Sequence, residues 1–375
     1  MIRERVLVTG GAGFIGSHLV EALIARGATV RVLDGLDPQV HGPGAVEPKL
    51  LPKTVEFIHG SVADPGAVDR ALADAPVVVH LAAMVGVGQS MYAIGPYVAG
   101  NAHGTAVLLD RIVNGGHAVR RLVVASSMSI YGEGRYRCAA CGLVAPRPRP
   151  AAQLEARDWE MRCPTCAAVV LAVPTDEDKP LAPTSVYAVT KRDQEELCLC
   201  VGRAYGIPTV ALRLFNVYGP RQSLSNPYTG AAAIFSSRLL NGEPPLIFED
   251  GRQSRDFVHV RDIVQAFSLA LERRDVADVA LNVGTGRATS IAAIASGLAT
   301  ALGVRQVPEV LGRFREGDIR HCVADITRAR RLLGYAPRVG LEDGLRELAE
   351  WSRGQRPEDR VGQARAELEA KRLIR

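Results

Sequence analysis

The sequence predicts an α/β protein: a Rossmann-type, doubly wound parallel sheet with a smaller mixed α/β lobe after it. In the first half of the chain, short apolar segments alternate with helix-length amphipathic ones. Because the short segments are apolar almost throughout, they are typical of strands buried on both faces. They are RVLVTG (5–10), VRVLD (30–34), VEFIHG (55–60), VVVHLA (77–82) and RLVVASS (121–127). The 375 residues, 47% of them hydrophobic, suffice for this sheet and a second lobe.

Helices and further strands follow from the same patterns. We expect helices over 14–26, 101–114, 185–205 and 290–302, and strands over 209–217 and 281–286. A loop rich in Gly, Pro, Ser and Asn at 219–230 leads into the second lobe. The expected parts are a nucleotide-binding domain over 1–217 with a return around 256–284, an insert over 134–175, a substrate-binding lobe over 218–355, and a charged tail over 356–375 that forms a solvated helix.

The charge pattern argues against nucleic-acid and membrane partners. The formal net charge is only +5, and the basic residues are scattered instead of clustered. No apolar run approaches the ~18–20 residues that cross a bilayer, and the start of the chain lacks a signal-peptide core. We therefore expect a cytoplasmic protein whose partner is an anionic small molecule.

A glycine-rich turn, TGGAGFIG, connects the first strand to the first helix. Gly10, Gly13 and Gly16 are three residues apart, which suits a tight turn, close approach of a pyrophosphate, and close packing of helix on strand. The helix then presents free N–H groups to the phosphates, starting at Phe14 and Ile15. Asp34 ends the second strand, where it can bind ribose hydroxyls, and no arginine follows it. The pattern predicts NAD in preference to NADP.

The segment YAVTK supplies a possible catalytic pair. Tyr187 and Lys191 are four residues apart, so they share one helix face. A tyrosine acts as a base near pH 7 only if nearby positive charge, such as an ammonium, favours its phenolate. Ser127 ends the fifth strand, at the sheet edge where open α/β folds bind ligands, and can hydrogen-bond a substrate hydroxyl.

Together, these motifs resemble the extended short-chain dehydrogenase/reductases, and within them the nucleotide-sugar 4-epimerases. The resemblance covers roughly residues 4–350 apart from the insert. Its motifs are TGGAGFIG, HLAA (80–83), NAHGT (101–105), SSMSIYG (126–132), YAVTK (187–191), RLFNVYGPRQ (213–222), RDFVHVRD (255–262) and REGD (315–318). It implies an NAD-dependent enzyme that acts on a nucleotide sugar, and a homodimer is expected.

The resemblance also implies roles for individual residues. Tyr187 would take the proton from the sugar hydroxyl while a hydride passes to the nicotinamide, and the keto-sugar would turn over before the hydride returns. Residues implied to bind the cofactor are Leu81, Ala82, Ala83 and Asn101, together with the glycine turn, Asp34, Tyr187 and Lys191. Residues implied to bind the substrate are Ser127, Ser129, Asn216, Arg221, Arg255, Arg315 and Asp318. The three arginines suit diphosphate oxygens, because guanidinium forks match them.

Two positions after Ser127 favour epimerisation over related reactions. The related 4,6-dehydratases carry an Asp-Glu pair there, and the related decarboxylases carry a Glu at the second position, whereas this chain has Met128 and Ser129. A stoichiometric nucleotide-sugar reductase or dehydrogenase remains an alternative. So does a non-catalytic NAD sensor, although a sensor needs no base.

Four cysteines in the insert predict a structural zinc site. Cys138, Cys141, Cys163 and Cys166 form two C-x-x-C pairs, and four thiolates leave zinc no open position for catalysis. Zinc would fold a long loop that has little core of its own. The remaining cysteines, Cys198, Cys200 and Cys322, are expected in the core.

We expect the insert to stand beside the sugar pocket or at the dimer contact, with Trp159 at that surface. Inserts of this type resemble those of epimerases that act on dTDP-6-deoxyhexoses. This substrate class therefore ranks first, and UDP-hexoses and GDP-sugars remain alternatives.

Overall fold

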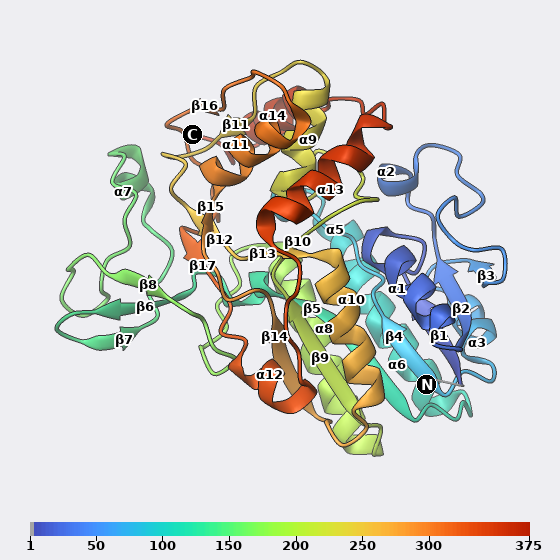
Figure 1. Ribbon diagram of the computed structural model, residues 1–375. Helices are drawn as coiled ribbons and strands as arrows, with labels where there is room; N and C mark the ends of the chain where they lie inside the picture. Colours follow the sequence, from blue (N-terminus) through green and yellow to red (C-terminus); the bar gives the residue numbers. More distant parts are fainter. Residues whose placement is uncertain (1–3) are drawn as a thin grey trace.

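A seven-stranded, fully parallel sheet forms the centre of the computed structural model, which describes residues 4–375 (Figure 1). Residues 1–3 of the predicted N-terminal domain lie outside the described residues. The strand order is β14-β9-β5-β4-β1-β2-β3, the doubly wound arrangement that the sequence predicts. The strands are β1 (Arg5–Thr9), β2 (Thr29–Asp34), β3 (Glu56–His59), β4 (Val77–His80), β5 (Arg121–Ser127), β9 (Thr209–Leu214) and β14 (Val279–Val283).

Helices cover both faces of this sheet. One layer contains α1 (Phe14–Ala25), α10 (Val260–Glu272) and α12 (Thr327–Leu333), and the other contains α3 (Pro65–Leu72), α6 (Gly104–Asn114) and α8 (Val186–Tyr205). Side chains of β1 alternate between the two layers: Val6 and Val8 pack in one apolar cluster, and Leu7 packs in the other. Helix α8 begins where the Ser185 side chain accepts the Ala188 N–H, and it ends at Gly206 in a left-handed conformation.

The strand predicted over 209–217 is interrupted at Phe215. Strand β9 ends at Leu214, and β10 (Asn216–Tyr218) pairs instead with β13 (Phe257–His259). The Phe215 N–H still donates to Val283 in the main sheet, whereas the Asn216 N–H donates to Asp256. The chain thus leaves the sheet at Phe215, and Asn216 lies beyond the sheet edge.

The second lobe has an apolar core of its own, built on α9 (Ala231–Leu240), α11 (Ile291–Leu302) and α13 (Leu341–Arg353). Two small sheets complete it. Their strands are β11 (Leu246–Ile247) with β16 (Glu309–Val310), and β12 (Ser254–Arg255) between β15 (Thr289–Ser290) and β17 (His321–Cys322). In the first domain, short helical segments follow strands β2, β4 and β5: α2 (Pro38–His41), α4 (Val87–Ser90), α5 (Ile94–Tyr97), η1 (Val98–His103) and η2 (Met128–Tyr131).

The insert forms a small three-stranded antiparallel sheet that projects from the body of the protein (Figure 1). Its elements are β6 (Arg135–Cys138), β7 (Gly142–Val144), α7 (Ala151–Glu155) and β8 (Leu171–Val173). Its apolar cluster has five buried members: Tyr136, Cys138, Met161, Cys163 and Val170. A core this small, two members of which are cysteines, offers little hydrophobic stabilisation.

The C-terminal segment contains the predicted helix, but the helix is docked, so the prediction that it is solvated is wrong. Helix α14 (Val361–Ala370) buries Ala364 and Leu368, one turn apart on the same face. The last residues then run antiparallel to 314–316: the N–H of Phe314 donates to Arg375 over 3.0 Å, and that of Glu316 donates to Leu373 over 2.9 Å. The charged composition of this segment gave no indication that Ala364 and Leu368 would pack against the rest of the protein.

None of the helices within residues 4–375 has the length and the apolar composition required to cross a membrane.

Candidate active site

The glycine turn has the geometry that a dinucleotide requires. Gly10 has φ +68°, and a Cβ there would lie 2.7 Å from the backbone nitrogen of Ala82. A Cβ on Gly16 would lie 2.4 Å from the Gly10 oxygen, so glycine alone allows α1 to pack this closely on the turn. Gly13 caps α1 without any side-chain hydrogen bond. The N–H groups at the start of α1, including those of Phe14 and Ile15, are therefore available to phosphate oxygens.

Asp34 ends β2 at the sheet edge, next to the turn. Its Oδ2 accepts the Ala12 N–H over 3.0 Å, and its Oδ1 accepts the Leu36 N–H over 2.9 Å. The carboxylate thus holds the glycine turn against the end of β2, where it can also meet ribose hydroxyls.

The segment 81–84 faces the turn from β4. The Leu81 N–H donates to the Thr9 carbonyl, and Ala83 lies between the two anchored ends. Buried Asn101 fixes the far end: its amide accepts the Met84 N–H over 2.6 Å and donates to the Met84 carbonyl over 3.1 Å. The Asn101 amide is thus used within the protein, where it fixes the segment 81–84 beside the glycine turn.

The three predicted catalytic side chains come from β5 and α8. Ser127 accepts hydrogen bonds from the Ser129 N–H and from the Ser129 hydroxyl, the latter over 2.9 Å. Burial raises the pKa of Tyr187, and a hydrogen bond with Ser127 opposes this rise. Ser90 of α4 accepts the Tyr187 backbone N–H, and the Tyr97 ring packs edge-on against the Tyr187 ring at 6.4 Å. Tyr187 is thus half-enclosed, with its hydroxyl beside Ser127.

Lys191 lies one turn after Tyr187 and is buried. Its Nζ donates to the Ala125 carbonyl over 2.6 Å and to Gln194 Oε1 over 2.7 Å. Burial lowers the pKa of Lys191 to about 8, so the ammonium persists at neutral pH.

A buried hydrogen-bond network continues from Lys191 to the nucleotide side. Because Gln194 Oε1 accepts from the ammonium, its Nε2 faces Thr105 Oγ1 at 2.8 Å and His80 Nε2 at 3.1 Å. The other His80 nitrogen lies 2.7 Å from the Thr9 hydroxyl, which in turn accepts the Ala82 N–H. Burial lowers the pKa of His80 to about 3, so the imidazole is neutral. The amide of Gln194, which also donates to the Ala82 carbonyl, thereby connects Lys191 to the segment beside the glycine turn.

The substrate side contains a cluster of the predicted phosphate-binding residues. Arg255 and Arg315 both pair with Asp318, over 3.1 Å and 2.8 Å. Burial opposes ionisation of Asp318, but the two guanidinium groups lower its pKa. Asn216 Oδ1 is buried and has no hydrogen-bond partner among the described residues. An unpaired amide and two arginines with one shared carboxylate are suited to an anionic ligand.

Arg221 is not joined to this cluster. Its backbone is left-handed, with φ +71°, and its guanidinium pairs with Glu21 of α1 over 2.8 Å. The structure therefore brings together Arg255, Arg315 and Asp318, and it places Arg221 against the helix that follows the glycine turn.

The four insert cysteines converge. Their sulfurs all lie within 4.8 Å of one another, and those of Cys138 and Cys166 are 3.5 Å apart. A tetrahedral zinc site with ~2.3 Å bonds holds its sulfurs about 3.8 Å apart, so the cluster fits this ion. Within residues 4–375, no other group of potential metal ligands converges in this way. Outside the cluster, Cys198 and Cys322 are buried as predicted, whereas Cys200 is exposed on α8 and its core prediction is wrong.

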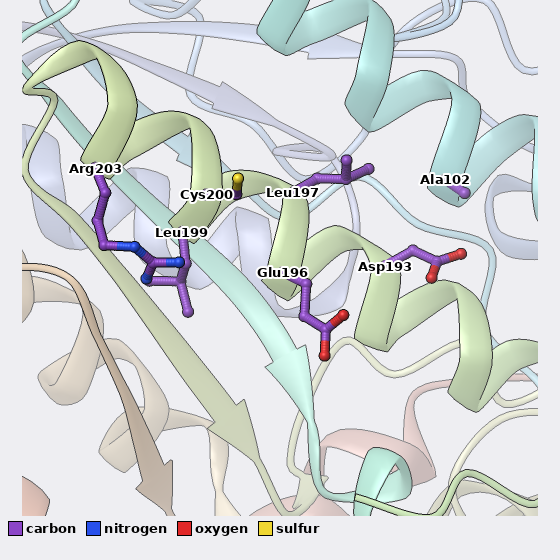
Figure 2. A pocket seen from close by; sticks show the side chains of 7 residues that line it. All are labelled: Ala102, Asp193, Glu196, Leu197, Leu199, Cys200 and Arg203. Carbon is purple, nitrogen blue, oxygen red and sulfur yellow. The ribbon is translucent and has the colours of Figure 1, made fainter.

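A surface hollow of about 620 Å³ lies on the outer face of α8. Figure 2 shows its lining side chains, which come from α8 and, across the hollow, from η1: Ala102, Asp193, Glu196, Leu197, Leu199, Cys200 and Arg203. The lining residues of α8 occupy the face of this helix opposite buried Lys191 and Gln194. The hollow is therefore separate from the candidate active site.

Two features of the structure were not predicted: Gln194 beside Lys191, and the docked tail. The position of Gln194, three residues after Lys191 on the same helix face, was a usable signal. Tyr92 and Tyr228, whose hydroxyls both donate to Glu367 Oε2 of α14, gave no local signal, because the three are distant in sequence.

Comparison with known proteins identifies relatives over nearly the whole chain. A sequence model described as "NAD dependent epimerase/dehydratase family" matches residues 6–147 and 165–284, with its gap inside the insert. The dTDP-L-rhamnose 4-epimerase of Burkholderia thailandensis is 40% identical over 350 residues, which cover 93% of this chain and 94% of the relative.

Solved structures are similar as well. The UDP-glucose 4-epimerase of Thermus thermophilus, in complex with NAD, is 31% identical with a TM-score of 0.74, covering 94% of this chain and 100% of that one. The UDP-glucuronic acid 4-epimerase of Bacillus cereus, in complex with UDP-glucuronic acid and NAD, is 30% identical with a TM-score of 0.76, covering 93% and 99%.

Proposed function

Since the chain belongs to the NAD-dependent epimerase/dehydratase family, we propose that it is a nucleotide-sugar 4-epimerase that inverts the C4 hydroxyl of a dTDP-6-deoxyhexose. The observation that carries the reaction is the meeting of Ser127 and Tyr187 at the sheet edge, one helical turn from the buried Lys191 ammonium. The substrate class rests on the 40% identity to the dTDP-L-rhamnose 4-epimerase.

Ser127 and Tyr187 would have different roles in the proton transfer. Ser127 would hold the C4 hydroxyl, and Tyr187 would remove its proton as the 4-keto sugar forms and return it at the end. Burial raises the pKa of Tyr187, so positive charge must favour its phenolate; Lys191 is placed to supply it. Met128 and Ser129 add no acid or base, which argues against 4,6-dehydration and decarboxylation.

Bound NAD would supply the nicotinamide ring that accepts the hydride and later returns it. The turn from Gly10 to Gly16 and the start of α1 would hold its pyrophosphate, with Asp34 on its ribose. On the substrate side, Asn216, Arg255 and Arg315 would bind the diphosphate and Asp318 the nucleoside ribose. Arg221 would need to release Glu21 to take part.

The alternatives predict different products. UDP-hexoses are supported by the similar UDP-sugar epimerase structures. GDP-sugars stay an alternative, because no residue has been identified that selects the nucleotide base. A reductase or dehydrogenase would change the amount of NADH stoichiometrically. A non-catalytic NAD sensor would leave every sugar unchanged.

The decisive experiment incubates the purified protein with dTDP-L-rhamnose, UDP-glucose and a GDP-hexose and follows the H4 signals by NMR. We expect a C4 epimer from the dTDP-sugar, no net NADH, and loss of turnover in Tyr187→Phe. A Tyr187→Phe variant with normal turnover would refute the catalytic assignment.

The four-cysteine cluster would bind one structural zinc ion. The sulfur spacing and the small core of the insert support this. Metal analysis of the purified protein tests it, and we expect about one zinc per chain, lost in a Cys138→Ser, Cys163→Ser variant.

We also propose a homodimer formed through the outer face of α8. Val189 and Leu197 of α8 are exposed there, and so are Ile94 and Val98 before α6, an apolar surface that suits a second copy of the chain. A Leu197→Glu variant should elute as a monomer.

The cytoplasmic location stays a prediction.

A further inference from the structure

The insert is attached to the second lobe by buried ion pairs. Arg149 of the insert makes a bidentate contact with Glu249, with nitrogen–oxygen distances of 2.9 Å and 2.7 Å, and both side chains are almost completely buried. The Arg149 guanidinium also donates to the carbonyl of Trp159 within the insert. Paired guanidinium and carboxylate groups in this geometry fix orientation as well as position.

Arg320 is the second cation of this network and is fully buried. It donates to Glu249 over 3.0 Å, to both Asp250 oxygens, and to Glu160 of the insert over 2.7 Å. The insert thus contributes one cation, Arg149, and one anion, Glu160. Withdrawal of Arg149 would leave the buried Glu249 carboxylate with one cation, Arg320, in place of two, and withdrawal of Glu160 would take one of three anions from Arg320.

The same network borders the candidate diphosphate site. The carbonyls of Ile319 and Arg320 accept hydrogen bonds from the Arg255 guanidinium, over 2.6 Å and 3.0 Å, while Asp318 pairs with it. The backbone N–H of Glu249 donates to the Arg313 carbonyl over 2.7 Å. The segment 313–320, which carries Arg315 and Asp318, is therefore held at both ends by residues that contact the insert.

The cysteine cluster stabilises the part of the insert that makes these contacts. Glu160 and Met161 lie three and two residues before Cys163, and Met161 belongs to the small apolar cluster that includes Cys138 and Cys163. A cluster this small gives the loop from Arg149 to Glu160 little hydrophobic support, and a metal bound by the four cysteines would add to it.

We propose that the metal-bound insert positions the diphosphate-binding arginines through Arg149, Glu249 and Arg320, so that occupancy of the four-cysteine site sets the affinity for the nucleoside diphosphate. Arg149 and Arg320 are positioning residues here. The proposal rests on the proposed function, because it assumes that Arg255, Arg315 and Asp318 bind the substrate.

The test measures the binding of dTDP and of UDP by isothermal titration calorimetry, in the wild-type protein, in Arg149→Met and in the Cys138→Ser, Cys163→Ser variant. The matched controls are Arg147→Met, an exposed arginine of the insert with no polar partner among the described residues, and Cys200→Ser, an exposed thiol outside the cluster. We expect Kd for the nucleoside diphosphate to rise about tenfold or more in Arg149→Met, because the buried ion network loses a cation. We expect a similar rise in the double cysteine variant, because the insert that carries this cation loses its metal site. NAD binding and the affinities of both controls should not change.

The outcomes separate this proposal from the proposed function. A wild-type protein that binds neither dTDP nor UDP would refute the substrate site itself. A wild-type protein that binds one of them, with Arg149→Met binding it equally well, would refute the role of the insert alone. Arg149→Met leaves the cysteines intact, so it decides the question even if the double cysteine variant fails to fold. Arg149→Lys should recover part of the affinity, and the loss should fall on KM instead of kcat.

Discussion

Gln194 Oε1 accepts a hydrogen bond from Lys191 Nζ over 2.7 Å, and both side chains are buried. The amide is fixed in this orientation, because its Nε2 donates to Thr105 on the opposite side. Burial lowers the pKa of Lys191 to about 8. Because a carbonyl acceptor stabilises the charged form of a buried lysine, we expect the Gln194 contact to favour the ammonium.

We predict that Gln194→Leu and Gln194→Glu shift the pH dependence of kcat in opposite directions. Leucine removes the acceptor, so the pKa of Lys191 falls, and the ammonium that favours the Tyr187 phenolate is lost at lower pH. Glutamate adds an opposing charge, so the pKa rises and activity extends to higher pH. Loss of a hydrogen bond to a charged group costs about 1.5–3 kcal/mol, so kcat of the leucine variant should fall roughly 10- to 150-fold.

Steady-state rates between about pH 6 and about pH 10, a range that brackets the lysine pKa, provide the measurement. Glu196→Gln, an exposed change on the same helix, should leave the profile unchanged. Parallel profiles for all variants would contradict this role of Gln194.

The docked C-terminal segment leads to a second prediction. Glu367 accepts hydrogen bonds from Tyr92, two residues after Ser90, and from Tyr228 in the second lobe, over 2.8 Å and 2.7 Å. Because Glu367 joins the segment that contains Ser90 to Tyr228, Glu367→Ala should raise KM for the nucleotide sugar about three- to tenfold, which corresponds to roughly 0.7–1.4 kcal/mol, with a smaller change in kcat.

Truncation after Arg360 removes the pairing with Phe314–Glu316 as well and should have a larger effect on KM. Lys371→Ala, an exposed change at the end of the helix, is the control. Unchanged KM in both the Glu367→Ala and truncated proteins would show that the segment has no part in substrate binding.

The sheet and the reactive groups were predictable because their signals are local. A buried parallel strand is apolar along its length, and the glycine turn and YAVTK place their residues by spacing alone. The strand predicted over 209–217 was too long, because an apolar sequence does not show which neighbouring strand it pairs with. Cys200 was misplaced because it lies in an apolar helix segment whose outer face is exposed.

Contacts between distant segments had no such signal. The Arg149–Glu249 pair joins residues 100 positions apart, and the sequence offers many arginines that could fill this role. The cysteine spacing predicted that the insert is held together, but only the structure places its attachment next to Arg320.

The glycine turn gives a third prediction. Gly16→Ala should destabilise the protein by about 3 kcal/mol or more and abolish NAD retention, because the new Cβ would meet backbone atoms of Gly10 and Gly11 that cannot move aside. Gly362→Ala, in the first turn of α14 with nothing within 4 Å of the added Cβ, should instead stabilise by about 0.5 kcal/mol. Denaturant unfolding and the cofactor content of the purified variants measure both effects, and equal stabilities would contradict the close packing of α1 on the turn.

The last prediction concerns acid stability and depends on the buried histidines. Burial lowers the pKa of His80 to about 3 and that of His259 to about 4, below the usual 6.5. Between pH 6.5 and these values the unfolded chain binds protons that the folded protein does not, so the free energy of unfolding falls as the pH falls through this window. Each histidine contributes roughly 2 kcal/mol to this loss by pH 5.

His259→Asn isolates one contribution. Asparagine keeps an acceptor for the Arg261 N–H at the start of α10 but cannot be protonated in this range. The loss of unfolding free energy between pH 7 and pH 5, measured by urea unfolding, should therefore be smaller in His259→Asn than in the wild type by about 2 kcal/mol. His59→Asn, a change at an exposed histidine, should leave the loss unchanged. If His259→Asn and wild type lose the same amount, His259 is not the neutral buried group that its surroundings imply.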